Sequence, residues 1–347
     1  MSVVTVIGSG QMGSAMSFPV RDNGHEMRLV GTPLDRKIID RLRTDDFHLN
    51  LKRTLPKGCR YYQIEEIEEA IRGADVILIG VSSFGVAWFR DTILPMLPEK
   101  TPLLSLTKGL INREDGSLET FLDEYRQQAD GRGLSLNAIG GPCTSYELAD
   151  RDPTTVCFCG EDPDTLRALA EIFRTDYYRI SLTTDVKGLE CAVALKNAYA
   201  LGVTLAVGLA QRREGIEGKQ HYNSQAALFA QSVKEMRRLL KHIGASEDNI
   251  IFGAGDLYVT IYGGRTRMIG TLLGRGLTFE QARAELKGVT LESVAITTCA
   301  AAAVRKKIER GELAERDFPL LLHCDDLINH GAQVNIPWER FEEEYFG

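Results

Sequence analysis

The 347-residue sequence lacks several features that would indicate particular partners or locations. It has no run of basic residues and a net charge of −7, so we expect neither a nucleic acid nor an anionic membrane as partner. No internal repeat or low-complexity tract is visible. The amino terminus, MSVVTVIGSG, has no basic segment, apolar core or small-residue cleavage site, so we expect no secretory signal peptide.

Cysteine and histidine are present, but not in the spacing of disulfide or metal sites. The seven cysteines include no C-x-x-C pair, and Cys157 and Cys159 lie two apart on an expected strand, so both point into one core. This pattern favours a reducing, cytoplasmic location. The six histidines show no metal-ligand spacing, so we expect no catalytic metal.

One apolar segment, residues 189–209, resembles a membrane span in length. It contains Glu190, Lys196 and Asn197, and charged side chains are rare and costly inside a bilayer. We therefore predict a buried helix and no membrane insertion.

The first half of the chain alternates β-rich runs with helical patterns, which predicts an α/β fold with a doubly wound parallel sheet. The expected strands are mostly unbroken hydrophobic runs, as in a sheet covered on both faces. They are residues 3–7, 26–30, 76–81, 103–106 and 136–139, with 154–159 and 177–180 as possible extensions. The expected helices between them are residues 11–23, 34–44, 64–72 and 117–128.

The second half reads almost entirely as helix. The expected helices are residues 189–209, 224–243, 278–285, 291–310 and 318–329. We place the boundary near Leu182, which gives a first domain over residues 1–182 and a mostly helical domain over 183–347.

A glycine-rich turn follows the first expected strand. Residues 8–13, Gly-Ser-Gly-Gln-Met-Gly, form G-x-G-x-x-G between a strand and a helix, the context of a Rossmann-type dinucleotide site. Gly8 permits the tight turn, Gly10 lets the backbone approach the pyrophosphate, and Gly13 allows close packing of helix and strand. The helix amino terminus offers N–H groups to the phosphates. The alternative is a glycine-rich turn that binds nothing.

The choice between NAD and NADP stays open. An acidic residue at the end of the second strand holds the ribose hydroxyls, whereas an arginine there accepts a 2′-phosphate. The strand ends in Val30-Gly-Thr-Pro33, with Asp35 and Arg36 beyond it.

Lys196 lies in the middle of a helix that is apolar around nearly its whole circumference, which predicts burial. Lysine is almost never fully buried unless it is paired, and burial lowers its pKa toward the range useful for proton transfer. We predict that Lys196 lines an active-site cleft between the domains. The alternative is a structural ion pair, for example with Glu190.

The chain resembles the NAD(P)-dependent glycerol-3-phosphate dehydrogenase family over essentially its full length. The stretches that carry the resemblance follow one another in the family's order and spacing. They are residues 8–13, 104–110, 140–142 with Glu147, 188–197, 255–260 and 262–267.

The resemblance implies a hydride transfer between NAD(P) and glycerol 3-phosphate or dihydroxyacetone phosphate. It implies that Lys196 is the general acid/base, held in position by Asp256, and that Lys108 faces the substrate oxygen. A positioned ammonium group suits this chemistry because alkoxide charge develops on the ketone oxygen. Arg265 would clamp the substrate phosphate, because its planar fork can donate two parallel hydrogen bonds.

The resemblance also implies two sets of binding residues. The substrate-binding positions are Asn197, Thr260, Arg265, Thr266 and Cys143. The cofactor-binding positions are Gly8, Ser9, Gly10, Gln11, Met12, Gly13, Thr32, Arg36, Phe84, Lys108, Arg265 and Glu292.

Two positions depart from the family pattern. Thr266 stands where the family usually has Asn, and Cys143 stands where it has Ser or Asn. Both should lie near the substrate, so the substrate could differ at either end. A nucleophilic role for Cys143 has no support, since no histidine partner is evident and hydride transfer needs no covalent thiol intermediate.

Several of these residues also have an alternative role without any function in binding or catalysis. Lys108 could be a solvated loop lysine, residues 255–257 could be an ordinary turn with a capping Asp256, and Arg267 could be surface charge. The alternative functions are a dehydrogenase of another phosphorylated polyol or of a small hydroxy acid, and a nucleotide-binding sensor without turnover. The apolar second half makes a homodimer plausible.

Overall fold

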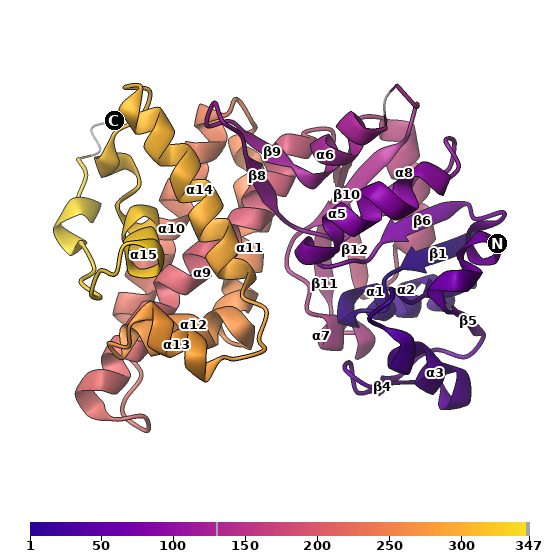
Figure 1. The fold of residues 1–347 in the computed structure, drawn as a ribbon, viewed down its shortest axis with the longest axis horizontal. Helices are drawn as coiled ribbons and strands as arrows, with labels where there is room; N and C mark the ends of the chain where they lie inside the picture. The colour runs from indigo at the N-terminus through magenta and orange to yellow at the C-terminus, as the bar shows by residue number, and fades with distance from the viewer. Residues whose placement is uncertain (130, 345–347) are drawn as a thin grey trace. The chain divides into compact units, whose positions relative to one another are not determined.

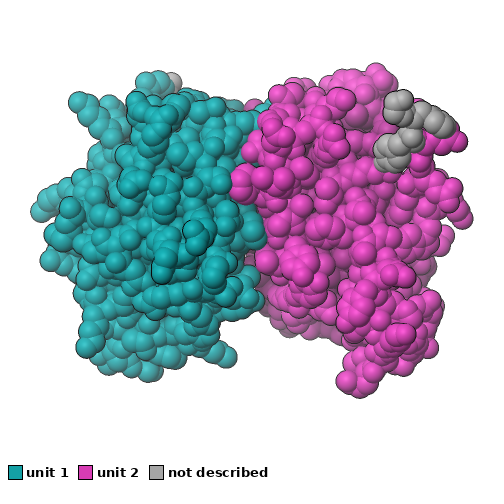
Figure 2. Space-filling view, turned by 180° about the vertical axis from the view of Figure 1, so that it is seen from behind, with its two compact units in different colours: residues 1–108, 120–190 teal, residues 109–119, 191–347 magenta. Residues whose placement is uncertain are grey.

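The computed structural model describes residues 1–129 and 131–344 (Figure 1). The chain forms two compact units, coloured separately in Figure 2. The first comprises residues 1–108 and 120–190, and the second comprises residues 109–119 and 191–347.

The first unit is built on an eight-stranded sheet with the order β12-β11-β10-β7-β6-β1-β2-β5. Its strands are β1 (Val3–Ile7), β2 (Glu26–Val30), β5 (Cys59–Tyr62), β6 (Val76–Ile79), β7 (Leu103–Ser105), β10 (Leu136–Gly140), β11 (Thr154–Gly160) and β12 (Tyr178–Thr183). The short strands β3 (Phe47–His48) and β4 (Arg53–Thr54) form a separate pair.

All neighbouring strands of this sheet run parallel except β10 and β11, which are antiparallel. Every residue of β6 and β10 is buried, so both faces of the sheet are covered there, as the unbroken hydrophobic runs predict. The predicted doubly wound fold is confirmed, and β11 and β12 extend the sheet as expected.

The order of the strands reverses beside β1, because β2 lies on one side of it and β6 on the other. In open α/β sheets, ligands bind at the carboxyl ends of the strands on either side of such a reversal. The turn that begins at Gly8 and the residues after β6 therefore lie at the expected place for a ligand.

Helices flank the strands of the first unit. The α-helices are α1 (Gln11–Ala15), α2 (Ser17–Asp22), α3 (Arg36–Asp45), α4 (Ile67–Ile71), α5 (Val86–Trp88), α6 (Phe121–Gln128), α7 (Ser145–Ala149) and α8 (Pro163–Phe173). The remaining turns of helix are η1 (Ile64–Glu66), η2 (Ser83–Gly85), η3 (Phe89–Ile93) and η4 (Leu94–Met96).

Two of the helices predicted for the first half of the chain differ from the structure in their continuity or their bounds. The helix expected over residues 11–23 is divided at Met16 into α1 and α2. Pro19 has no N–H to give to the carbonyl four residues before it, so a continuous hydrogen-bond ladder is impossible there. The helix expected over residues 117–128 begins only at Phe121, because residues 118–120 form a short strand and Thr120 caps the helix.

The second unit is a bundle of helices around one core. They are α9 (Val186–Glu214), which starts in the first unit, α10 (Tyr222–His242), α11 (Ile250–Ile261), α12 (Gly264–Gly274), α13 (Phe279–Glu285), α14 (Glu292–Glu309) and α15 (Pro319–Asn329). Shorter elements are η5 (Glu247–Asn249), η6 (Glu315–Asp317), η7 (Trp338–Phe341) and the strand pair β8 (Leu110–Asn112) and β9 (Leu118–Thr120).

Residues 109–119 belong to the second unit although the chain reaches them from the sheet. The ammonium group of Lys306, on α14, donates a hydrogen bond of 2.8 Å to the carbonyl oxygen of Arg113. The units divide between Glu190 and Cys191, eight residues beyond Leu182, and the boundary at 182 stays a prediction about domains.

Helix α9 is the core of the second unit. From Gly188 to Gly208 every residue except Lys196 is buried. Among the described residues, α9 is the one helix long and apolar enough to cross a membrane, but 89% of its most apolar window is buried inside the protein. The core helix of a globular domain has this property, which agrees with the interpretation from the sequence.

Candidate active site

The glycine turn after β1 leaves no room for side chains. Gly8 has a φ of 112°, and a Cβ atom there would lie 2.6 Å from the backbone of Gly80. A Cβ atom on Gly13 would lie 2.4 Å from the carbonyl oxygen of Gly8. The turn therefore needs glycine at both positions, as the motif predicts.

A cavity of about 410 Å³ lies over this turn, at the carboxyl ends of β1, β2 and β6. It is within the size range of small-molecule and cofactor sites. The residues that line it are Gly8, Gly10, Thr32, Pro33, Leu34, Asp35, Gly80, Val81, Ser82, Phe84, Gly85 and Trp88.

The cavity brings together four of the predicted cofactor residues: Gly8, Gly10, Thr32 and Phe84. Four others lie in or beside the turn but do not line it. Ser9 is buried, Gln11 donates a hydrogen bond to the carbonyl oxygen of Asn50, and Met12 and Gly13 lie at the start of α1.

Asp35 and Arg36 differ in their surroundings. Asp35 lines the cavity, and its carboxylate accepts hydrogen bonds from the amide and hydroxyl of Thr32 at 2.9 and 2.8 Å. Arg36 is exposed and forms an ion pair with Glu65. The carboxylate rather than the guanidinium is therefore part of the cavity wall.

Of the residues that follow β6, sequence reasoning named Phe84 but missed Gly80, Ser82 and Trp88, which also line the cavity. The available signal was the glycine directly after a fully apolar strand. Its significance depends on β6 lying next to β1, which the sequence order does not reveal.

Lys108 lies in the turn after β7, and its ammonium group donates a hydrogen bond of 3.3 Å to the carbonyl oxygen of Gly141. It is partly buried, so it is not a fully solvated loop lysine. Cys143 lies two residues after Gly141 and is also partly buried. The hydroxyl of Thr144 donates to the carboxylate of Glu147 at 2.5 Å.

Lys196 is the centre of a polar network inside the second unit. Its side chain is 14% exposed, and its ammonium group donates hydrogen bonds to Asp256 Oδ1 at 3.0 Å and to Thr260 Oγ1 at 2.8 Å. The hydroxyl of Thr260 in turn donates to the carbonyl oxygen of Asp256 at 2.7 Å. A buried charge is thereby paired and hydrogen-bonded, as its burial requires.

Asp256 and Thr260 lie four residues apart on α11, so they project from the same face of that helix. The alternative in which residues 255–257 form a turn is wrong, because Asp256 lies within the helix and is 1% exposed. Gly253 permits the approach of α11 to α9, since a Cβ atom there would lie 2.8 Å from the carbonyl oxygen of Ala192.

Glu190 is not the carboxylate that pairs with Lys196 in the structure. It is buried near Thr120 in the first unit, and burial raises the pKa of its carboxyl group to about 8. Asn197, next to Lys196, is buried.

The beginning of α12 brings together three predicted binding residues. Arg265 and Thr266 lie in its first turn, after Gly263 and Gly264, and Thr266 is buried. The guanidinium of Arg265 lies 3.8 Å from the carboxylate of Glu292, at the start of α14. Arg267 donates a hydrogen bond of 2.7 Å to the carbonyl oxygen of Ile261, so it is not merely a solvated surface charge.

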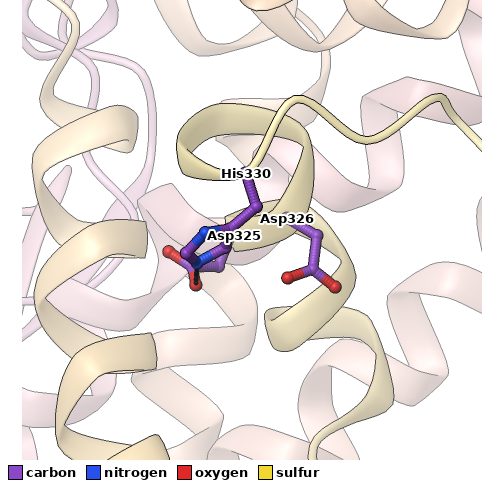
Figure 3. Close-up of side chains that lie close together, drawn as sticks. All are labelled: Asp325, Asp326 and His330. Carbon is purple, nitrogen blue, oxygen red and sulfur yellow. Dashed lines mark ion pairs between the residues drawn. The ribbon is translucent and has the colours of Figure 1, made fainter.

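Among the residues that the structure describes, one group of side chains has the composition of a metal site: Asp325, Asp326 and His330 (Figure 3). Arg305 forms ion pairs with both carboxylates, at 3.0 and 2.6 Å, and His330 lies 3.4 Å from Asp325. Because Arg305 bridges both carboxylates and compensates part of their charge, both acidic side chains have a cationic partner within the protein. The absence of a catalytic metal stays a prediction.

Comparison with known proteins follows the division of the chain. Residues 3–166 match the family model described as NAD-dependent glycerol-3-phosphate dehydrogenase N-terminus, and residues 185–338 match the model of the corresponding C-terminus. An NADP(+)-dependent glycerol-3-phosphate dehydrogenase of Archaeoglobus fulgidus is 34% identical over 287 residues, which are 82% of this chain and 84% of that protein.

A glycerol-3-phosphate dehydrogenase [NAD(P)+] of Shouchella clausii is 28% identical over 99% of this chain and 95% of its own. Among solved structures, a glycerol-3-phosphate dehydrogenase from Plasmodium falciparum superposes with a TM-score of 0.82 at 18% identity, over 100% of this chain and 96% of that one. The structure from Coxiella burnetii gives a TM-score of 0.77 at 22% identity, over 98% and 97%. These structures support the fold.

Proposed function

The chain belongs to the NAD-dependent glycerol-3-phosphate dehydrogenase family, and we propose how its own residues carry out that reaction. It is an NAD(P)-dependent oxidoreductase acting on a CH–OH group, and it interconverts sn-glycerol 3-phosphate and dihydroxyacetone phosphate. The proposal concerns the residues that hold the substrate and move the proton.

The observation that carries the proposal is the network around Lys196. A bound nicotinamide supplies or accepts the hydride, which leaves the protein to move one proton. The ammonium group of Lys196 gives a proton to the ketone oxygen of dihydroxyacetone phosphate and takes it back in the reverse reaction. Asp256 and Thr260 hold the nitrogen in place at 3.0 and 2.8 Å.

The fit of a dinucleotide to the first unit is supported by the cavity over the glycine turn. Gly8 and Gly80 approach so closely that a Cβ atom on either would overlap the other's backbone. Glycines at such a point let a pyrophosphate reach the backbone N–H groups at the start of the helix. Lys108, Arg265 and Glu292 are further proposed contacts of the cofactor, Lys108 also facing the substrate oxygen.

The phosphate of the substrate is proposed to bind at the start of α12. Arg265 can donate a pair of hydrogen bonds to an oxoanion, and Thr266 can donate one from its hydroxyl. Asn197, Thr260 and Cys143 are proposed to contact the rest of the substrate. Because Thr266 and Cys143 differ from the usual residues, other phosphorylated polyols belong in the test.

The decisive experiment measures the oxidation of NADH and of NADPH with dihydroxyacetone phosphate and a panel of other phosphorylated ketones and of 2-oxo acids, the oxidised partners of hydroxy acids. We expect turnover with dihydroxyacetone phosphate that exceeds turnover with every other ketone. A preference for another ketone would change the assignment of the substrate. Binding of reduced nicotinamide without any turnover would favour the nucleotide-binding sensor instead.

We further propose that the protein works in the cytoplasm as a homodimer. All seven cysteines are free thiols, as a reducing compartment maintains. The second unit exposes large apolar side chains on neighbouring helices, among them Ile251, Tyr258 and Met268, which a partner could cover. Sedimentation of the purified chain at twice its monomer mass of 38.5 kDa would support the dimer, and a monomer at all concentrations would refute it.

A further inference from the structure

A second cavity lies wholly within the second unit, among α9, α12 and α13. Its volume is about 420 Å³, which suits a small metabolite. Its polar lining comes mainly from Gln211 on α9, from Arg267 and Thr271 on α12, and from Arg275, which directly follows α12.

Two guanidinium groups give this cavity a positive character. Arg267 and Arg275 are both partly buried and lie eight residues apart, about two turns of α12. Each makes one hydrogen bond of 2.7 Å to a neutral oxygen, Arg267 to the carbonyl of Ile261 and Arg275 to the side chain of Gln211.

Neither arginine forms an ion pair with any residue that the structure describes, although Glu285 is also one of the residues that line the cavity. A guanidinium has five N–H donors, so each of the two has donors beyond the one used. The charge of both groups is therefore not compensated by a neighbouring carboxylate within ion-pair distance.

Thr271 supplies the second, independent observation. It is 9% exposed, and within the described residues its buried hydroxyl has no hydrogen-bond partner. Helical threonines usually donate to the carbonyl four residues earlier, as Thr204 on α9 does to Ala200 at 2.8 Å. A buried hydroxyl without a partner is unfavourable, and rotation of the Thr271 side chain about χ1 toward the cavity that it lines would give the hydroxyl a ligand oxygen as partner.

We propose that this cavity binds a small molecule that carries an oxoanion, a phosphate or a carboxylate, on a short apolar group. The two guanidinium groups would donate to the oxoanion, as their planar forks favour, and the Thr271 hydroxyl would donate a further hydrogen bond. Val207, Leu272 and Leu286 form the apolar part of the lining.

The cavity is separate from the groups assigned to the reaction. Gln211 lies 15 residues after Lys196 on α9, which is about 22 Å along the helix. Arg267 lies two residues after Arg265, so the two side chains project from roughly opposite faces of α12. A ligand here would bind in addition to the substrate, not in its place.

The test is isothermal titration of the full chain carrying Arg265→Gln, which weakens the phosphate contact proposed for the reaction. The probes are propyl phosphate and butyrate, one for each oxoanion. We expect at least one probe to bind with a stoichiometry of one per chain. Whichever binds more tightly identifies the oxoanion, and either result supports the proposal.

Variants made in this background locate the binding. Arg275→Gln is expected to weaken the probe about tenfold, and Thr271→Val about threefold. The matched control is Arg283→Gln, which removes the same charge from an exposed position on α13 outside the lining and should leave affinity unchanged. Thr271→Val keeps the side chain's shape and breaks none of its hydrogen bonds, so it remains informative if Arg275→Gln fails to fold.

Three results would overturn the proposal. The first is no saturable binding of either probe. The second is binding that Arg275→Gln and Thr271→Val leave unchanged, or that Arg283→Gln weakens equally. The third is a dimer that binds no probe and dissociates on Arg275→Gln, which would mean that a second copy of the chain covers the cavity.

Discussion

The glycine turn of the first unit and the lysine network of the second differ in how their parts are distributed along the chain. The turn uses six consecutive residues, and its properties come from backbone that side chains would block. The network joins Lys196 to side chains 60 and 64 residues away on another helix. A contiguous motif can be recognised from the sequence, whereas a network depends on how two helices pack.

The comparison predicts that a change in the network affects chemistry and a change in the turn affects folding and cofactor binding. The largest effect is expected from Lys196→Met. It removes the proton donor while keeping an unbranched apolar stem, so kcat should fall about 10²- to 10⁴-fold with little change in cofactor affinity. Stopped-flow kinetics and NADH fluorescence titration measure the two quantities.

The matched control is Lys187→Met, which changes an exposed lysine near the start of the same helix and should leave kcat unaltered. Normal turnover by Lys196→Met would exclude Lys196 as the general acid/base.

Gly8→Ala tests the turn by steric means. The new methyl group would overlap Gly80 at 2.6 Å, so we expect the free energy of unfolding to fall by about 3 kcal/mol or more and cofactor binding to be lost. Gly24→Ala is the control, because Gly24 also has a positive φ, of 76°, but a methyl group there would have no atom within 4 Å, and a loss of about 1 kcal/mol is expected. Urea denaturation measures the free energy of unfolding of both variants. Equal losses would show that the cost of a positive φ, rather than steric overlap with Gly80, determines the effect of Gly8→Ala.

Each unit contains a buried carboxyl group, so the pH dependence of the free energy of unfolding can be compared between the two units. Burial raises the pKa of Glu190 to about 8, above its value in the unfolded chain, so the folded state binds the proton more tightly. Its contribution to stability is complete below about pH 4.5 and is lost as the pH rises toward 8, at up to about 1.4 kcal/mol per pH unit.

Glu190→Gln should therefore flatten the pH dependence of the free energy of unfolding between pH 5 and 8. Glu235, in the second unit, accepts backbone hydrogen bonds from Leu320 and Leu321 at 2.8 and 3.0 Å, and burial raises the pKa of its carboxyl group to about 7. The pH dependence of the free energy of unfolding that Glu235 causes should therefore end one pH unit lower than that caused by Glu190. Denaturation curves at several pH values test both, and an unchanged slope in Glu190→Gln would contradict the first.

The smallest expected effect concerns the choice of cofactor. The carboxylate of Asp35 lines the cavity beside Thr32, where it would repel a 2′-phosphate. Asp35→Asn should lower the KM for NADPH relative to that for NADH, by about fivefold or less because the site is open to solvent. A ratio of KM values that does not move would place the selectivity elsewhere, for example at Arg36.

The sequence predicted the sheet better than the second unit's helices. The bounds of β1 and β2 were predicted to the residue. In a parallel sheet, strands alternate with helices along the chain, and the hydrophobic run of each buried strand stands out from its flanking segments. Helices α11 and α12 were not predicted, since glycines at 253, 255, 263, 264 and 270 reduce helix propensity. Gly253, Gly270 and Gly274 instead serve close packing, which only tertiary structure reveals.

The candidate site was predictable in its parts but not in its contacts. Lys196 was recognised because a lone lysine in an apolar helix needs a partner, yet the residues alone could not choose between Glu190 and Asp256. The packing of α11 on α9 decides this. Asp35 was noted beyond the strand, but its place in the cavity wall depends on the turn over residues 32–35, in which the amide of Asp35 donates a hydrogen bond of 2.9 Å to the carbonyl oxygen of Thr32.

The hydroxyl of Thr260 has a single hydrogen, and the carbonyl of Asp256 already accepts it. Toward Lys196 the threonine oxygen can then only accept, so the nitrogen must present an N–H to it whether or not the amine is charged. An amine that has released its proton retains two hydrogens, one for Thr260 and one for Asp256. Its lone pair is thereby fixed in the direction from which the proton left, and the reverse transfer begins without any rotation of the side chain.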